Sequence, residues 1–103
     1  MIHALFRYND GKINAFTIKG HANAGEYGKD IVCSAVSSAA ICTANTLTDI
    51  MNIDCKVIVK DGLLTVSIDS PSKSATDVLE GLRLHLTELS KDYSQFLTVT
   101  TEV

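Results

Sequence analysis

A histidine and a cysteine flank a glycine-bearing stretch in the first third of the chain. His21 follows a run of strand-forming residues, and Cys33 lies near the start of a long apolar segment. A cysteine thiolate attacks carbonyl carbon atoms, and an imidazole within hydrogen-bond distance can take the thiol proton. These two side chains are therefore the minimum set for covalent acyl transfer.

The position of Cys33 favours a reactive thiol. Asp30 is a suitable N-cap for the helix predicted to follow, and it would place Cys33 at the third helical position. The helix dipole and the N–H groups of the first turn stabilise a thiolate there. The backbone N–H groups of Cys33 and Ser34 could hold the oxyanion that forms during attack. Asp30 could instead orient the imidazole of His21, and the sequence does not separate these two roles.

The same residues allow other interpretations. Cys33 could be an inert core cysteine and His21 a surface residue, because cysteine is among the most buried residue types. A phosphate-binding loop is disfavoured, since Glu26 stands where the P-loop pattern requires lysine. A zinc site that includes His21 and Cys33 has no paired-ligand spacing to support it. We therefore expect neither a metal nor a cofactor.

Two hairpins are predicted to position this pair. Residues 2 to 8 and 13 to 19 are rich in strand-forming residues and are separated by a segment that contains Asp-Gly. Residues 56 to 60 and 63 to 68 repeat this arrangement around Asp61-Gly62. Asp-Gly between two such runs is a strong signal for a tight turn.

Two helices and a fifth strand complete the predicted fold. Apolar residues at spacings of three and four predict a helix from Asp30 to about Ile50, and Ser70-Pro71-Ser72 precedes a second helix of about twenty residues. The alternation of residues 96 to 103 predicts a strand. The order ββαββαβ indicates one α+β domain over residues 1–103, with a five-stranded, mainly antiparallel sheet and two packed helices.

Each predicted helix has an apolar face expected to pack on the sheet, and Leu84 points away from the second of these faces. The two faces comprise Val32, Val36, Ala39, Ala40, Thr43, Leu47, Ile50 and Met51 in the first helix, and Ala75, Val78, Leu79, Leu82, Leu86, Leu89 and Tyr93 in the second.

Composition and charge restrict the kind of partner. Nine basic and twelve acidic side chains give a net charge of −3, and the basic residues do not cluster, so direct binding of nucleic acid is not expected. A slightly acidic surface suits a basic protein partner. With 46% hydrophobic residues and one proline, the 103-residue chain should form a folded domain rather than a disordered segment.

The cysteines and the hydropathy pattern bear on the compartment. Three cysteines without CxxC spacing argue against a disulfide framework, and Cys42 and Cys55 are expected to pack as small hydrophobic residues. His3 and His85 are expected to be structural. The first residues do not resemble a signal peptide, and no segment is expected to reach the roughly 18 apolar residues of a membrane helix. These features predict a cytoplasmic protein that does not enter membranes.

Gly20-His21-Ala22, Gly28 and the run from Asp30 to Ser37 resemble the signature of the ribosomal-processing cysteine protease family, also called Prp. The spacing of His21 and Cys33 matches the family pattern, as do an Asp three residues before the cysteine and a Ser four residues after it. The chain length and the predicted element order agree with the family from end to end.

The resemblance implies an endopeptidase that removes a short N-terminal extension from large-subunit ribosomal protein twenty-seven. It implies cleavage after a phenylalanine in a Phe-rich motif, a ribosomal protein precursor as substrate, and a small homodimer.

The resemblance also implies roles for individual residues. Cys33 would be the nucleophile and His21 the general base, with Asp30 and Ser37 supporting the site. The segment from Ala22 to Lys29 would form a flexible loop over the substrate. Within this loop, Ala22, Gly25 and Gly28 are expected to contact the substrate, together with Gly20, which directly precedes His21.

Two rivals from other classes predict different behaviour of Cys33. A noncatalytic ribosome-assembly factor would bind the same basic ribosomal protein without cutting it, and Cys33→Ala would function normally. A thiol redox sensor would depend on reversible oxidation of Cys33.

Overall fold

Two antiparallel hairpins supply four strands of the sheet. In the computed structural model, which describes residues 1–21 and 31–103, β1 (Ile2–Asn9) and β2 (Lys12–Lys19) are joined by Asp10-Gly11. β3 (Lys56–Lys60) and β4 (Leu63–Ser67) are joined by Asp61-Gly62. Both predicted hairpins are confirmed.

The turn glycines explain why Asp-Gly marked the hairpins. Gly11 and Gly62 have φ values of +76° and +71°, in the left-handed region that a side chain disfavours. Each is the second residue of a two-residue turn, since Asn9 pairs with Lys12 and Lys60 pairs with Leu63.

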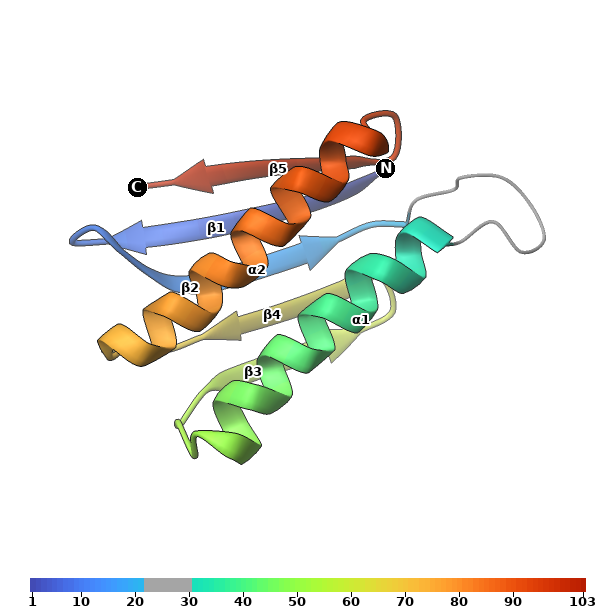
Figure 1. The fold of residues 1–103 in the computed structure, drawn as a ribbon. Helices are drawn as coiled ribbons and strands as arrows, with labels where there is room; N and C mark the ends of the chain where they lie inside the picture. Colours follow the sequence, from blue (N-terminus) through green and yellow to red (C-terminus); the bar gives the residue numbers. More distant parts are fainter. Residues whose placement is uncertain (22–30) are drawn as a thin grey trace.

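The described strands form one sheet of five strands in the order β3-β4-β2-β1-β5 (Figure 1). β5 (Leu97–Glu102) lies parallel to β1, whereas the other neighbouring pairs are antiparallel. The predicted five-stranded, mainly antiparallel sheet in ββαββαβ order is therefore confirmed.

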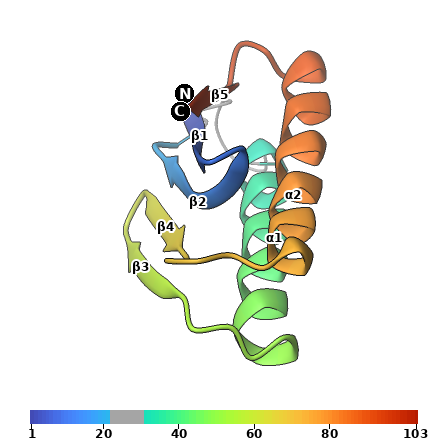
Figure 2. The ribbon, with the colours of Figure 1, turned by 90° about the vertical axis from the view of Figure 1, so that its left-hand side faces the viewer.

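Two long helices of the described chain cover one face of this sheet. α1 (Ile31–Asn45) follows β2 in the chain and α2 (Lys73–Asp92) follows β4. Seen along the edge of the sheet, both helices lie on the same side (Figure 2). The Ser72 hydroxyl accepts a hydrogen bond of 3.1 Å from the Ala75 backbone N–H, so α2 begins at the predicted start signal.

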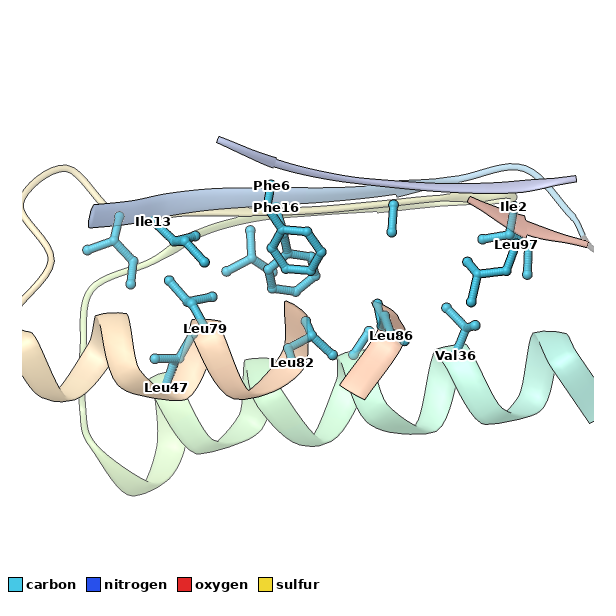
Figure 3. Close-up of a cluster of buried hydrophobic side chains, with 14 of the residues drawn as sticks. Ile2, Phe6, Ile13, Phe16, Val36, Leu47, Leu79, Leu82, Leu86 and Leu97 are labelled. Atoms are coloured by element: carbon cyan, nitrogen blue, oxygen red, sulfur yellow. The ribbon is translucent and has the colours of Figure 1, made fainter. Parts of the chain in front are cut away.

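The core fills the space between the helices and the sheet (Figure 3). The rings of Phe6 and Phe16 lie with their centroids 6.0 Å apart, one from each strand of the first hairpin. Aliphatic side chains surround them, as expected for a chain without tryptophan. The largest fully buried aliphatic side chains are Ile13, Leu47, Leu79, Leu86, Leu97, Val32, Val36 and Val66.

The predicted first helix changes its geometry before it ends. Thr46–Ile50 form a π-helical segment, η1, in which the Met51 N–H donates to the Thr46 carbonyl at 2.9 Å. The wider turn rotates later side chains relative to a regular 3.6-residue period. Leu47 stays buried, but Ile50 is 75% exposed, so the prediction that Ile50 belongs to the buried face is wrong.

The cysteine predictions have a mixed outcome. Cys55 is partly buried against the core, as expected. Cys42 is exposed, so the expectation that it packs as a hydrophobic residue is wrong. It shares a helical face with Ser38 and Asn45, which are also exposed, because residues three and four apart lie on the same side of a helix.

The segment Ile31–Ile50 is 20 residues long and is apolar enough to meet the length and composition criteria for a membrane span. The expectation that no segment would reach this length is therefore wrong. Val32, Val36 and Leu47 of this segment are buried in the core against the sheet. Packing inside the fold accounts for only part of this apolar composition, because 22% of the segment is buried and Ile31, Ile41 and Ile50 are exposed.

Candidate active site

A cavity of about 330 Å³ opens between α1, the end of β2 and the β3–β4 hairpin. Most of the side chains that line it are apolar, including Ile18, Val36, Ala40, Ile41, Val59 and Leu64. Its volume lies at the lower end of the range of about 300–1,000 Å³ for ligand pockets. The cavity therefore has room for one or two apolar side chains of a bound molecule.

The cavity brings together residues that lie on different elements. Cys33 is the third residue of α1, as the sequence predicts, and it packs partly against the core. His21 follows the end of β2 after one intervening glycine, and its side chain is 57% exposed. Both residues line the cavity. A thiol in the first helical turn and an imidazole thus share one apolar opening.

Backbone contacts on two sides hold the segment that carries His21. The Met1 amino group donates a hydrogen bond of 2.6 Å to the His21 carbonyl. The Gly20 N–H donates to the Gly62 carbonyl at 2.8 Å. Gly20 has a φ of +97°, and a Cβ at this position would collide with the Met1 carbonyl oxygen. Glycine is therefore required at position 20 to bring the chain this close to the start of β1.

The other predicted site residues differ in their placement. Ser37 lies one helical turn after Cys33 and lines the cavity. The Ser34 side chain is exposed, so its predicted contribution is limited to its backbone N–H. Asp30 and the three loop residues Ala22, Gly25 and Gly28 lie outside the described residues.

The β3–β4 hairpin also belongs to this site, although no sequence signal predicts it there. Lys60, Gly62 and Leu63 line the cavity, and the Asp61 Oδ1 atom lies 3.9 Å from His21 Nε2. The Asp61-Gly62 pair gave a turn signal and no sign of a contact with a residue forty positions away. Recognising β4 as the neighbour of β2 would have placed this turn beside the end of β2.

Among residues 1–21 and 31–103, no group of three or more His, Cys, Asp or Glu side chains could hold a metal ion. The polar groups at the cavity are instead the types used in nucleophilic catalysis. A thiol near a helix N-terminus, an imidazole and an apolar opening together suit attack on a carbonyl group attached to an apolar residue.

Comparison with known proteins identifies the family. The family model described as cysteine protease Prp matches residues 1–98. The chain belongs to the Prp family of cysteine proteases.

Relatives in the Prp family match the chain over most of its length. The ribosomal processing cysteine protease Prp of Bacillus subtilis strain 168 is 30% identical, over 100% of this chain and 99% of that protein. The Staphylococcus aureus protein of the same name (strain Mu50) is 26% identical, over 84% of this chain and 85% of its own. The Prp family is thus one of ribosomal processing cysteine proteases.

Solved structures show the same fold. The crystal structure of the S. aureus Prp protease in complex with a covalently linked product peptide superimposes with a TM-score of 0.90 and 25% identity, over 99% of this chain and 100% of that one. A Streptococcus mutans protein gives a TM-score of 0.82 and 27% identity, over 99% and 94%. The Prp arrangement of sheet and helices therefore extends over the whole chain.

Proposed function

We propose that this protein is an endopeptidase that removes the N-terminal extension of large-subunit ribosomal protein twenty-seven, cutting after a phenylalanine. Cys33 is the nucleophile and His21 the general base. One observation carries this proposal: the thiol of Cys33 in the first turn of α1 and the imidazole of His21 line the same apolar cavity. Membership of a cysteine protease family supports it.

The first half of the proposed reaction forms a covalent intermediate. The imidazole of His21 takes the thiol proton, and the Cys33 sulfur attacks the carbonyl carbon of the scissile peptide bond. The carbonyl oxygen becomes an oxyanion near the N-terminus of α1, where the backbone N–H groups of Cys33 and Ser34 stabilise its charge. When the C–N bond breaks, the imidazolium gives its proton to the departing amine, and a thioester remains.

The second half releases the other product. His21 removes a proton from a water molecule, whose oxygen attacks the thioester carbon. The C–S bond then breaks, the N-terminal extension leaves with a new carboxyl group on its phenylalanine, and Cys33 regains its proton from the imidazolium. Besides the substrate, this reaction consumes only one water molecule, and the side chains of Cys33 and His21 carry out every bond and proton transfer.

The apolar lining of the cavity supports specificity for phenylalanine. Burying such a side chain stabilises a complex by about 1.5–3 kcal/mol. Cys33, Ser37 and Ile41 are spaced four residues apart, so they form a row of about 12 Å along α1. A phenylalanine beside the scissile bond would therefore extend from the thiol along this row. Asp30, Ser37 and the loop with Gly25 and Gly28 support the site in this proposal.

Cleavage of the ribosomal protein precursor tests this function. We expect the wild-type protein to release the extension after phenylalanine and Cys33→Ala to lose at least about 10³-fold in kcat, since the nucleophile is removed. Cys42→Ala, on the exposed side of the same helix, should retain full activity. Binding of the precursor without cleavage, unchanged by Cys33→Ala, would establish the noncatalytic assembly factor instead.

A second comparison tests the role of Ser37. Ser37→Ala should lower kcat/KM, whereas Ser38→Ala should not, because both serines are exposed but only Ser37 lines the cavity. Equal activity of the two variants would remove Ser37 from the proposed site.

We also propose that the protein acts as a homodimer in the cytoplasm. A reducing compartment keeps the Cys33 thiol available, and the proposed substrate is made there. Sedimentation analysis at micromolar concentration should give about twice the 11.1 kDa mass of one chain. A monomer with full cleavage activity would overturn the dimer.

A further inference from the structure

The tip of the β3–β4 hairpin lies directly against the imidazole of His21. A Cβ atom added to Gly62 would lie 2.9 Å from His21 Nε2 and 3.5 Å from both Cδ2 and Cε1 of the ring. The ring therefore lies against Gly62, and a side chain at position 62 would require the exposed ring to shift. Gly62 also lines the cavity that contains Cys33.

A hydrogen bond fixes the hairpin tip relative to the chain that carries the imidazole. The Gly20 N–H donates to the Gly62 carbonyl at 2.8 Å, immediately beyond the last paired residues, Lys19 and Leu63. A movement of the turn would thus move both the backbone before His21 and the surface beneath its ring.

The neighbouring carboxylate adds a weaker interaction. Asp61 Oδ1 lies 3.9 Å from His21 Nε2 and attracts the ring when it carries a proton. The side chains of Asp61 and His21 are 99% and 57% exposed, so water screens most of this attraction. The carboxylate therefore adds a screened attraction to the contact with Gly62.

We propose that Asp61-Gly62 at the tip of the β3–β4 hairpin is a positioning element for His21, which holds the imidazole at the mouth of the Cys33 cavity. Gly62 provides the surface on which the ring rests, and Asp61 provides a carboxylate that attracts the ring after it accepts the thiol proton. This inference rests on the proposed function of His21 as the base, and it assigns a role to a turn 40 residues further along the chain.

Two glycine substitutions test the proposal with a matched control. Gly62→Ala and Gly11→Ala both place a side chain at a left-handed φ, +71° and +76°, in an Asp-Gly turn between antiparallel strands. A Cβ at Gly11 meets nothing within 4 Å, whereas a Cβ at Gly62 meets the imidazole. The two variants should therefore lose similar stability, and only Gly62→Ala should displace the ring.

Cleavage kinetics should separate the two variants. We expect Gly62→Ala to lower kcat by roughly 10- to 100-fold with a smaller change in KM, since a displacement of about 1 Å costs this much in positioned catalysis. Gly11→Ala should cleave like the wild type once its melting temperature is taken into account. Equal kcat values for the two variants would overturn the proposal.

The carboxylate has its own test. Asp61→Asn should lower kcat/KM by a few fold at low ionic strength, and the difference should shrink at high salt because the two groups are exposed. Asp61→Glu should restore part of the loss, and Asp10→Asn in the other turn should have no effect. Wild-type kinetics for Asp61→Asn at low salt would overturn the role of this carboxylate.

A measurement that needs no substrate separates this inference from the proposed function. The chain has three histidines, so the ring C–H resonances of His3, His21 and His85 can be followed by NMR. Gly62→Ala should shift the His21 resonances alone, and Gly11→Ala should shift none. If the protein cleaves no peptide but this pattern holds, the protease proposal fails and the positioning stands. Unshifted His21 resonances in Gly62→Ala overturn the positioning even in an active enzyme.

Discussion

The thiols of Cys42 and Cys55 differ in how far they are buried. Burial raises the pKa of the Cys55 thiol, and the nearby carboxylate of Asp54 raises it further. Cys42 lies on the exposed side of α1. Because the thiolate is the reactive form, the two thiols should differ in reactivity.

Alkylation measures this difference. At pH 7.5 we expect iodoacetamide to modify Cys55 more slowly than Cys42, since the raised pKa of the Cys55 thiol disfavours its reactive form and its side chain is less exposed. Peptide mapping by mass spectrometry over a time course gives each rate, with Cys33→Ala as the background to avoid competition from the proposed nucleophile. Faster modification of Cys55 than of Cys42 would contradict this prediction.

At the scale of residues, the candidate site was predictable where its residues lie close in sequence. His21 and Cys33 were singled out by type and spacing and Ser37 by the family resemblance, and all three line the cavity. Gly62 and Asp61 were not, because their contact with His21 depends on the pairing of β2 with β4. Strand pairing is a long-range property, and a single sequence gives the turn without its neighbour.

At the scale of elements, a hydrogen-bonded group joins β1 to α2. The Tyr8 hydroxyl donates to Glu80 Oε2 at 2.8 Å, and Arg83 donates to Glu80 Oε1 at 2.7 Å. Burial raises the pKa of Tyr8 above its usual value of 10.0, and the hydrogen bond to Glu80 raises it further. This group ties the outer end of the first hairpin to the middle of the helix.

Removing the Tyr8 hydroxyl should destabilise the fold moderately. We expect Tyr8→Phe to lower the free energy of unfolding by about 0.5–1.5 kcal/mol, near the low end because Glu80 keeps its bond to Arg83. Urea denaturation at pH 8 measures the change, with Tyr93→Phe as a control for loss of a phenol elsewhere.

The same variant should show a pH dependence. The folded chain holds the Tyr8 proton more tightly than the unfolded chain, so the Tyr8 contribution is complete below about pH 10 and is lost as the pH rises through the raised pKa. The stability difference between wild type and Tyr8→Phe should therefore shrink between pH 8 and pH 11. A difference that grows over this range would contradict the assignment.

Elements were predictable where local signals were strong. The Asp-Gly turns predicted both hairpins. Ser72, together with the apolar face of the second helix, predicted α2. The first helical run ends at Ile50 as predicted, but the geometry of its last turn was not predictable, because the π-helical hydrogen bond from Met51 to Thr46 changes the period after Asn45. A pattern based on 3.6 residues per turn continues through such a change and leaves Ile50 on the wrong face.

At the scale of the whole molecule, stability depends on one layer of apolar contacts between the sheet and two helices. Leu86 and Leu84 allow a matched test on α2, since Leu86 is fully buried and Leu84 is 55% exposed. Leu86→Ala should lower the free energy of unfolding by about 2–5 kcal/mol, the cost of a cavity in a core. Leu84→Ala should change it by less than about 0.5 kcal/mol.

Thermal unfolding measures both variants. A loss of about 1 kcal/mol lowers the melting temperature of a domain of this size by roughly 4–8 °C, so Leu86→Ala should melt far below Leu84→Ala. Similar melting temperatures for the two variants would show that the helix packs on the sheet through a different face.

The described residues that line the Cys33 cavity all lie between Ile2 and Leu64, whereas α2 and β5 complete the fold without reaching it. A group attached to the exposed face of α2 would therefore not block the opening of the cavity. Position 84 is a suitable place to attach a fluorophore or a linker to a solid support. An immobilised form of the protein, joined through this helix, would present the cavity to peptides in solution.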